Sequence, residues 1–291
     1  MSNSASTIPL VDLVILMDTS PSMKDVANAV SDAVAAAITA AEANCPADLR
    51  VVWLGIEGRW RGTAFKRTLR TYLTKDCGVA EAKLRGRKRG ELPSAGAQED
   101  AARAIEDVSN HFDWREQAYR SLFYLGDEAL EGGGGKTEAA DIEAANLAIQ
   151  SAQASHVRVH TYLGMSKSKH RDTIQPEYAR VAAETQGQFF AAVDAPTNFA
   201  AVLEQIICGS QTPIYYKEIN MSKKSSSQNS EDKASDAPPA NETPTPEPPK
   251  SYVPTSMTGL QDYSYWWDYA REEAKKSGSK SKSFRRGRIW A

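Results

Sequence analysis

Short apolar runs alternate with longer helix-like stretches through most of this chain, and this alternation limits what it can fold into. The run at 11–17 (VDLVILM) is almost continuously apolar, which is typical of a parallel strand buried on both faces. Further strands are expected at 49–55, 65–74, 121–125, 157–163 and 188–193. Helices are expected between them, at 24–42, 98–112, 137–154, 176–185 and 198–208. This order predicts an α/β fold with a Rossmann-like, mostly parallel central sheet and helices on both faces.

One segment of this pattern has a less regular interpretation. Residues 65–74 (FKRTLRTYLT) alternate between apolar and polar side chains, so they are expected to form a strand, with an antiparallel hairpin as one arrangement. Residues 75–97 read as loop. Residues 132–135 are four glycines followed by Lys136 and Thr137, but the spacing is not that of a phosphate-binding loop, and a flexible turn is expected.

Composition changes abruptly after the α/β region and divides the chain. Residues 1–8 read as a flexible N-terminus, and 9–216 as the folded domain. Residues 217–256 are rich in Ser and Pro and poor in large apolar side chains, so they cannot bury enough surface to offset their ordering entropy. They are expected to be a disordered linker, so that the domain is followed by a disordered tail.

The last segment, 257–291, combines aromatic residues with a basic end. Its candidate partner-binding side chains are Tyr263, Trp266 and Trp267. The segment is expected to dock, as a helix or short motif, in the groove of a second protein partner or assembly. Folding back onto its own domain and binding a membrane surface are the alternatives.

The formal net charge of −2 is an average over unlike regions. Residues 58–90 hold eleven bases against two acids, which is +9, and 217–291 sum to +3, which leaves −14 for the rest. The densest basic stretch contributes four candidate partner-binding residues: Arg85, Arg87, Lys88 and Arg89. One interpretation is a basic rim beside the metal site that binds an acidic protein surface, and another is a solvated loop. Nucleic-acid contact is less favoured, because no recognised nucleic-acid-binding fold accompanies these residues.

Cysteine usage and hydropathy bear on location. The three cysteines Cys45, Cys77 and Cys208 lack metal-site spacing and are an odd number, so free thiols are expected, as in a reducing compartment. No run approaches the roughly 20 apolar residues of a transmembrane helix, and no secretory signal is visible. The expected location is the cytoplasm.

A cluster of oxygen-bearing side chains follows the first strand. Asp18, Ser20 and Ser22 form the pattern D-x-S-x-S, and Asp127 follows the 121–125 strand. Because the carboxyl ends of parallel strands meet at one edge, these side chains are expected to converge there. Oxygen ligands suit a hard cation, so the sequence predicts a Mg²⁺ site, with Mn²⁺ or Ca²⁺ as alternatives. A turn and helix cap is the simpler interpretation of the pentapeptide alone.

Over residues 9–209 the sequence resembles the von Willebrand factor A (vWA) family, whose metal-ion-dependent adhesion site (MIDAS) has the same D-x-S-x-S motif. The stretch FDWREQAYRSLFYLGDEALEGGG resembles integrin β I-like and bacterial members, with a W-R pair before the Asp-bearing strand and a Gly-rich turn after it. The family's loop threonine ligand has no match in 93–100, where an alanine replaces it. Three weaker candidates could substitute: Ser94, Gln98 and Glu99.

The resemblance implies a non-enzymatic binding module, in which the metal's open position takes an acidic residue of a protein partner. A role as adaptor of a MoxR-type AAA+ ATPase is the alternative within the family. A structural component of a large particle, targeted by its tail, is another possibility. A metal-dependent phosphohydrolase is the enzymatic alternative and the least favoured, because no general base, nucleophile or phosphate loop accompanies the motif.

Overall fold

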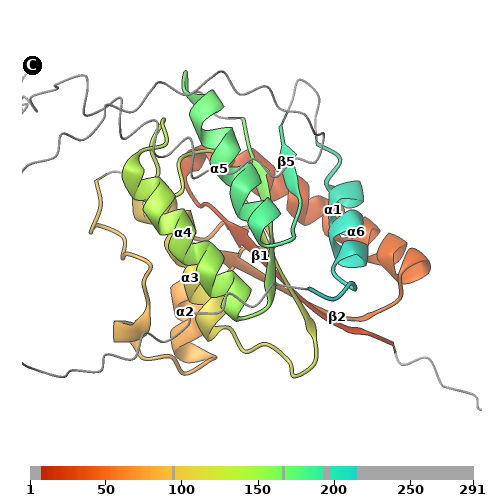
Figure 1. Cartoon of the computed structure of the whole chain (residues 1–291). Helices are drawn as coiled ribbons and strands as arrows, with labels where there is room; N and C mark the ends of the chain where they lie inside the picture. Colours follow the sequence, from red (N-terminus) through yellow and green to blue (C-terminus); the bar gives the residue numbers. More distant parts are fainter. Residues whose placement is uncertain (1–7, 94–95, 166–167, 193–196, 215–291) are drawn as a thin grey trace, which may run out of the picture. The chain divides into compact units, whose positions relative to one another are not determined.

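The computed structural model describes residues 8–93, 96–165, 168–192 and 197–214, which form an α/β domain (Figure 1). Five strands make one sheet in the order β2-β1-β3-β4-β5, and every pair of neighbours is parallel. The strands are β1 (Leu10–Met17), β2 (Asp48–Gly55), β3 (Tyr119–Gly126), β4 (Val157–Leu163) and β5 (Phe189–Ala191). The predicted fold class is therefore confirmed.

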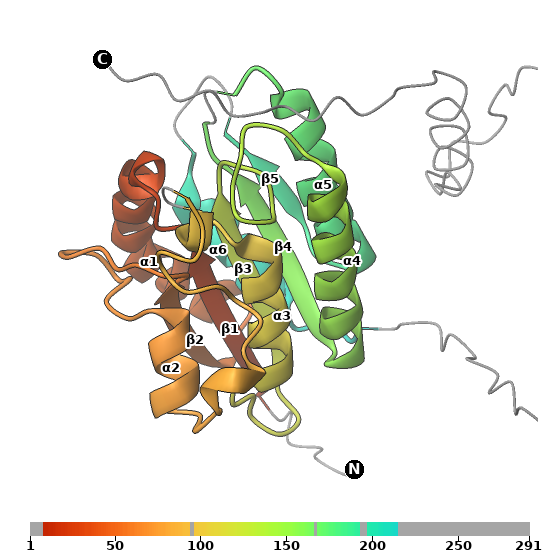
Figure 2. The same cartoon turned by 90° about the vertical axis from the view of Figure 1, so that its left-hand side faces the viewer.

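Helices cover the sheet on both faces, in three layers (Figures 1 and 2). On one face lie α1 (Lys24–Asn44) and α6 (Phe199–Gly209), which pack against each other and against alternate β1 side chains such as Ile15. The other face holds α2 (Leu69–Lys75), α3 (Ala101–His111), α4 (Ala139–Ala154) and α5 (Arg171–Glu184). Because β1 is buried on both sides, its sequence is apolar without alternation, apart from Asp12.

The strand order creates a point where the chain changes direction across the sheet. From β1 the chain goes to β2 on one side, and then returns to β3 on the other side of β1. In doubly wound sheets of this order, ligands bind outside the carboxyl ends of the strands at that switch. The predicted motif residues follow the two strands that flank it.

The strand expected at 65–74 is wrong. Residues 65–68 precede a helix and contain one isolated parallel bridge, between Gly55 and Thr68, and the segment belongs to the helix α2 from Leu69 on. The Thr68 hydroxyl caps the helix by accepting a hydrogen bond from the Thr71 N–H at 3.1 Å. Leu69, Tyr72 and Leu73 then point into the core at helical spacing, so the same side chains satisfied both a two-residue and a helical period. The loop expected at 75–97 also contains two 3₁₀ turns, at Glu81–Lys83 and Gly96–Gln98.

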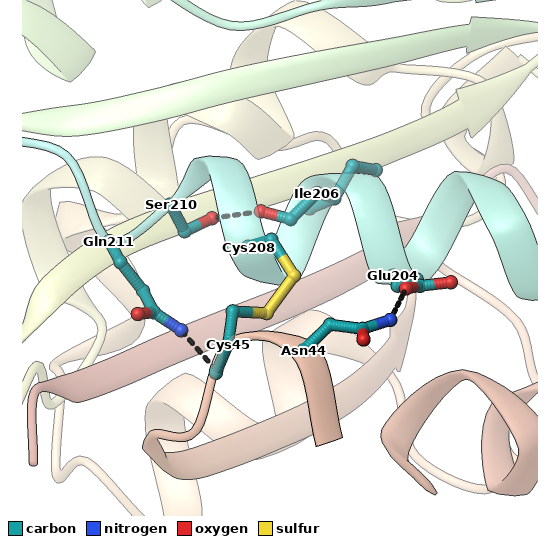
Figure 3. Close-up of a disulfide and its surroundings, with 7 residues drawn as sticks. All are labelled: Asn44, Cys45, Glu204, Ile206, Cys208, Ser210 and Gln211. Carbon is teal, nitrogen blue, oxygen red and sulfur yellow. Dashed lines mark hydrogen bonds between the residues drawn. A yellow bond between two sulfur atoms is a disulfide. The ribbon is translucent and has the colours of Figure 1, made fainter. Parts of the chain in front are cut away.

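The expectation of unpaired thiols is wrong for two of the three cysteines. Cys45 and Cys208 form a disulfide that joins the ends of α1 and α6, with 5.4 Å between the Cα atoms and a sequence separation of 163 (Figure 3). Gln211 donates a side-chain hydrogen bond to the Cys45 carbonyl at 2.5 Å. Cys77 is free. A pairing between such distant residues is invisible in their spacing, and the argument for a reducing compartment loses its premise.

Within the described ranges, no helix is long and apolar enough to cross a membrane. The predicted flexible N-terminus lies almost wholly outside the described residues. The predicted linker at 217–256 and docking segment at 257–291 lie wholly outside them.

Candidate functional site

Two aspartates lie beside each other at the carboxyl edge of the sheet. Asp18 directly follows β1 and Asp127 directly follows β3. The register pairs Met17 with Leu125, and the Asp18 N–H donates to the Leu125 carbonyl at 2.9 Å. The backbone of the two strands therefore positions both carboxylates at the switch point.

A chain of hydrogen bonds joins the motif residues. The Ser20 N–H donates to Asp18 Oδ1 at 2.6 Å. The hydroxyls of Ser20 and Ser22 lie 2.9 Å apart, and Ser22 donates to Asp127 Oδ1 at 3.1 Å. The structure thus brings together the four residues Asp18, Ser20, Ser22 and Asp127 that the sequence singled out.

The second carboxylate oxygen of Asp18 is left without a partner. The residue is fully buried, and no hydrogen bond reaches Oδ2 in the described part of the chain. Burial and the negative charges of Asp127 and Glu99 raise the pKa of Asp18 well above its usual value. A buried carboxylate without a cation is costly, so a positive ligand here would stabilise the folded state.

Glu99 supplies a third carboxylate from the loop before α3. Burial is the main cause that raises the pKa of Glu99 to about 7, and the negative charges of Glu128 and Asp127 add to it. A hydrogen bond with Ser20 opposes the shift. The Thr19 N–H donates to the Gln98 carbonyl at 3.3 Å, which ties this loop to the motif. Of the three weaker candidates, Glu99 thus shares the site with Ser20.

The other two weaker candidates are placed differently. The side-chain amide of Gln98 lies beside Gly58, close enough that a β-carbon there would collide with it. Gln98 also lines a cavity that adjoins the motif. Ser94 falls outside the described residues.

An internal ion pair holds the Glu99 loop in place. The fully buried Asp100 carboxylate accepts two hydrogen bonds from the Arg87 guanidinium, each at 3.0 Å, and one from the Arg87 N–H at 3.2 Å. Arg87 also pairs with Glu131 at 2.8 Å. Bidentate pairing of this kind is geometrically specific, so Arg87 fixes the backbone next to Glu99.

The remaining predicted partner-binding residues differ in how free they are. Arg85 pairs with Glu106 at 3.5 Å, and Lys88 with Glu81 at 3.2 Å. Arg89 is exposed and forms no ion pair with the described residues. The aromatic candidates Tyr263, Trp266 and Trp267 lie outside the described residues.

The four-glycine segment is a defined turn around the acidic site. Gly133 has φ +77°, and a β-carbon at this position would collide with the Glu99 carboxylate. The Gly134 N–H donates to Glu128 Oε2 at 2.7 Å. Only glycine combines this backbone conformation with such a close approach, so the turn encloses the carboxylates. Sequence reasoning missed this role, although the glycine run itself was the signal.

The donor chemistry at this edge fits a hard divalent cation. Carboxylate and hydroxyl oxygens converge there, and one carboxylate oxygen is buried and unpaired. In the described ranges no three His, Cys, Asp or Glu side chains form a metal-binding group by themselves. A cation at this site would therefore depend on Ser20 and Ser22 as well as on the acids.

No protein-family model matches the chain, and no curated protein matches it by sequence. By structure it is similar to proximal thread matrix protein 1 of the mussel byssus, at 13% identity and TM-score 0.35, over 69% of this chain and 46% of that one. It is also similar to the N-terminal domain of TFIIH p34, which has a vWA-like fold, at 11% identity and TM-score 0.34, over 69% and 98%. A third similarity is to the Flv1 flavodiiron core of Synechocystis, at 10% identity and TM-score 0.26, over 69% and 34%.

The chain spans less than half the length of the mussel protein and about a third of the flavodiiron core. At these scores the similarities concern the fold alone, and no functional argument rests on them.

Proposed function

We propose that this chain is a non-enzymatic, metal-dependent protein-binding module of the vWA type. The carrying observation is the buried Asp18 carboxylate, which has one unpaired oxygen and is linked through Ser20 and Ser22 to Asp127 at the switch point. In this proposal Asp18, Ser20 and Ser22 hold Mg²⁺, while Asp127 and Glu99 provide further negative charge. An acidic side chain of a partner protein completes the site.

The bound cation supplies positive charge and an open position for an anionic ligand. The protein's own residues prepare that position. The two serines contribute neutral oxygens, so the ion keeps more of its charge than it would among carboxylates alone. Glu99 takes the place of the family's loop threonine, and the Arg87–Asp100 pair keeps it there.

Among the described residues, Ser20 and Ser22 bond to each other and to carboxylates. A carboxylate is itself able to act as a general base, so the non-enzymatic part of the proposal has its own test. No turnover of a generic phosphoester in Mg²⁺ is expected, and turnover that Ser20→Ala abolishes would contradict it. No observation favours phosphate-ester hydrolysis. The particle alternative depends on residues 257–291, which lie outside the described residues, and nothing in the described part of the chain bears on the adaptor role.

The test is thermal unfolding of the full chain with Mg²⁺ and with EDTA. Mg²⁺ is expected to raise the unfolding temperature, because it binds the folded state alone. Asp18→Ala is expected to abolish this shift, whereas Asp32→Ala, which removes an exposed acid on α1, should retain it. A shift of equal size in Asp18→Ala, or no shift in the natural chain, would overturn the metal site.

A further inference from the structure

A cavity of about 650 Å³ adjoins the carboxyl edge of the sheet, beside the candidate metal site. Thr19, Pro21 and Gln98 line it on the side of the motif, and the segments after β2 line the opposite side. Thr19 stands between Asp18 and Ser20 in sequence, so the cavity and the candidate metal site share one wall. Nothing in the proposed metal coordination uses this space.

The cavity has an excess of unpaired positive charge. Arg59, Lys66 and Arg89 line it, are exposed, and form no ion pair with the described residues. The other charged residues of its wall are already paired. Arg67 pairs with Asp76, and Glu57 pairs with Arg70. The three free cations therefore face an opening with no unpaired acid in its lining.

The wall that presents these cations is well defined. The backbone N–H of Trp60 donates to the Phe65 carbonyl at 2.9 Å, and the Thr63 hydroxyl donates to the Trp60 carbonyl at 3.0 Å. Residues 60–65 therefore form a closed turn. Gly58 has no side chain, which lets Thr19 and Gln98 pack directly against its backbone. Two buried polar atoms of the lining, Trp60 Nε1 and Thr19 Oγ1, have no hydrogen-bond partner in the described part of the chain.

We propose that this basic cavity, defined by Arg59, Lys66 and Arg89, binds a second acidic residue of the same partner segment. The inference deepens the proposed function, because one carboxylate of the partner would occupy the metal and another the cavity. Guanidinium groups bind carboxylates through paired N–H donors, and two of the three free cations are arginines. The partner segment is thus an acidic peptide with at least two carboxylates.

An acidic peptide fits this surface better than a nucleic acid. Asp18, Glu99, Asp127 and Glu128 lie just beyond the shared wall, and their charges would repel a continuous phosphodiester backbone. A peptide can place its acids at the cation and in the cavity and put neutral residues between them.

The test measures binding of a fluorescent peptide, in which glutamates alternate with glycines, to the full chain in Mg²⁺ and in EDTA. Arg59→Gln combined with Arg89→Gln is expected to weaken binding about fivefold in both conditions, because both arginines are partly solvated. The matched control is Lys75→Gln combined with Lys83→Gln. It removes two exposed cations of the same basic region that do not line the cavity and form no ion pair with the described residues, and it should leave affinity unchanged.

Three outcomes decide the matter, with unchanged thermal unfolding as the check on folding. Equal weakening by both double variants indicates general charge attraction and overturns the proposal that the cavity binds an acidic residue. Tighter binding of an oligothymidylate of equal charge, lost in the Arg59/Arg89 variant, replaces the peptide with a nucleic acid and also overturns it. Weakening by the cavity variant alone, in EDTA as in Mg²⁺, supports the cavity even where the Mg²⁺ dependence of the proposed function fails.

Discussion

The two ends of strand β1 lie in different electrostatic environments. Asp12 lies near its start and Asp18 directly after its end, and both side chains are completely buried. Asp12 accepts hydrogen bonds from Arg50 at 2.7 and 3.1 Å, and from Arg115 through Nε and the backbone N–H, both at 2.7 Å. Asp18 accepts a hydrogen bond from the Ser20 N–H and faces the acids Asp127 and Glu99.

The comparison distinguishes a structural carboxylate from one that needs a ligand. At the start of β1 the two arginines compensate the charge, and Arg115 also bonds the Val11 carbonyl, so it ties the loop before β3 to β1. At the other end the described residues place no arginine or lysine in an ion pair with Asp18. Buried charges persist in proteins when they are paired or bind a metal. Asp12 is paired with two arginines, whereas Asp18 has no cationic partner among the described residues.

The disulfide belongs to the structural end as well. Cys45 follows α1 and lies three residues before β2 begins, so the Cys45–Cys208 bond stabilises the edge opposite the candidate site. The amino edge of the sheet therefore holds stabilising contacts, and the proposed function places ligand binding at the carboxyl edge. The predictions below separate these roles, from the largest expected effect to the smallest.

Removal of the disulfide is predicted to have the largest effect. Cys45→Ser should lower the free energy of unfolding by about 4 kcal/mol, because it frees a long loop in the unfolded chain. Chemical denaturation with and without a reductant measures this, and Cys77→Ser, which changes the free cysteine, is the control. The unfolding-temperature shift with Mg²⁺ should persist in Cys45→Ser. Identical stability of the natural chain in both redox conditions would contradict the prediction.

The two β1 aspartates are predicted to respond in different ways to loss of charge. Asp12→Asn should cost about 3 kcal/mol, since it leaves two partly buried arginines without their shared acid. Asp18→Asn in EDTA should cost nothing, or stabilise by about 1 kcal/mol, because it removes a buried charge that repels its neighbours. Denaturant titration of the two variants checks this directly. Equal destabilisation by both would show that the two ends do not differ.

The smallest effect is a pH dependence at Glu99. Its pKa is about 7 in the folded state against 4.5 as the ordinary value, so between these pH values the folded chain binds the proton more tightly than the unfolded chain. In EDTA the stability from this group should therefore fall as the pH rises from 4.5 to 7 and stay low above that, by about 1–2 kcal/mol once solvent screening reduces the full effect of the shift.

Glu99→Gln is the matched variant for this titration. It should remove the Glu99 part of the slope, and Mg²⁺ should remove it in the natural chain by stabilising the charged form. Unfolding temperatures across this pH range, compared between the two chains, measure the difference. A slope that is the same in Glu99→Gln would assign the titration to another group.

Local pattern predicted most of the architecture but failed where two periods fitted the same residues. The helix before β2 and the strands β1 and β3 were confirmed, because the length of an apolar run bounded by turn residues favours a strand, and a long alanine-rich stretch favours a helix. Residues 65–74 satisfied both a strand and a helix, and the Thr68 cap together with burial of Leu69 and Leu73 favoured the helix. The burial is not visible without the neighbouring elements, whereas the Thr68 cap is a local contact that the sequence itself could have indicated.

By itself the sequence determined the parallel α/β fold and the placement of Asp18, Ser20, Ser22 and Asp127 at strand ends, because hydrophobic periodicity and the residues that end a strand are properties of short segments. The tertiary structure decided which loop residue joins them, since Glu99 reaches the site through the distant Arg87–Asp100 pair. It also decided which bases remain free and which cysteines pair. These outcomes depend on contacts between residues far apart in sequence, and only packing of the whole domain creates such contacts.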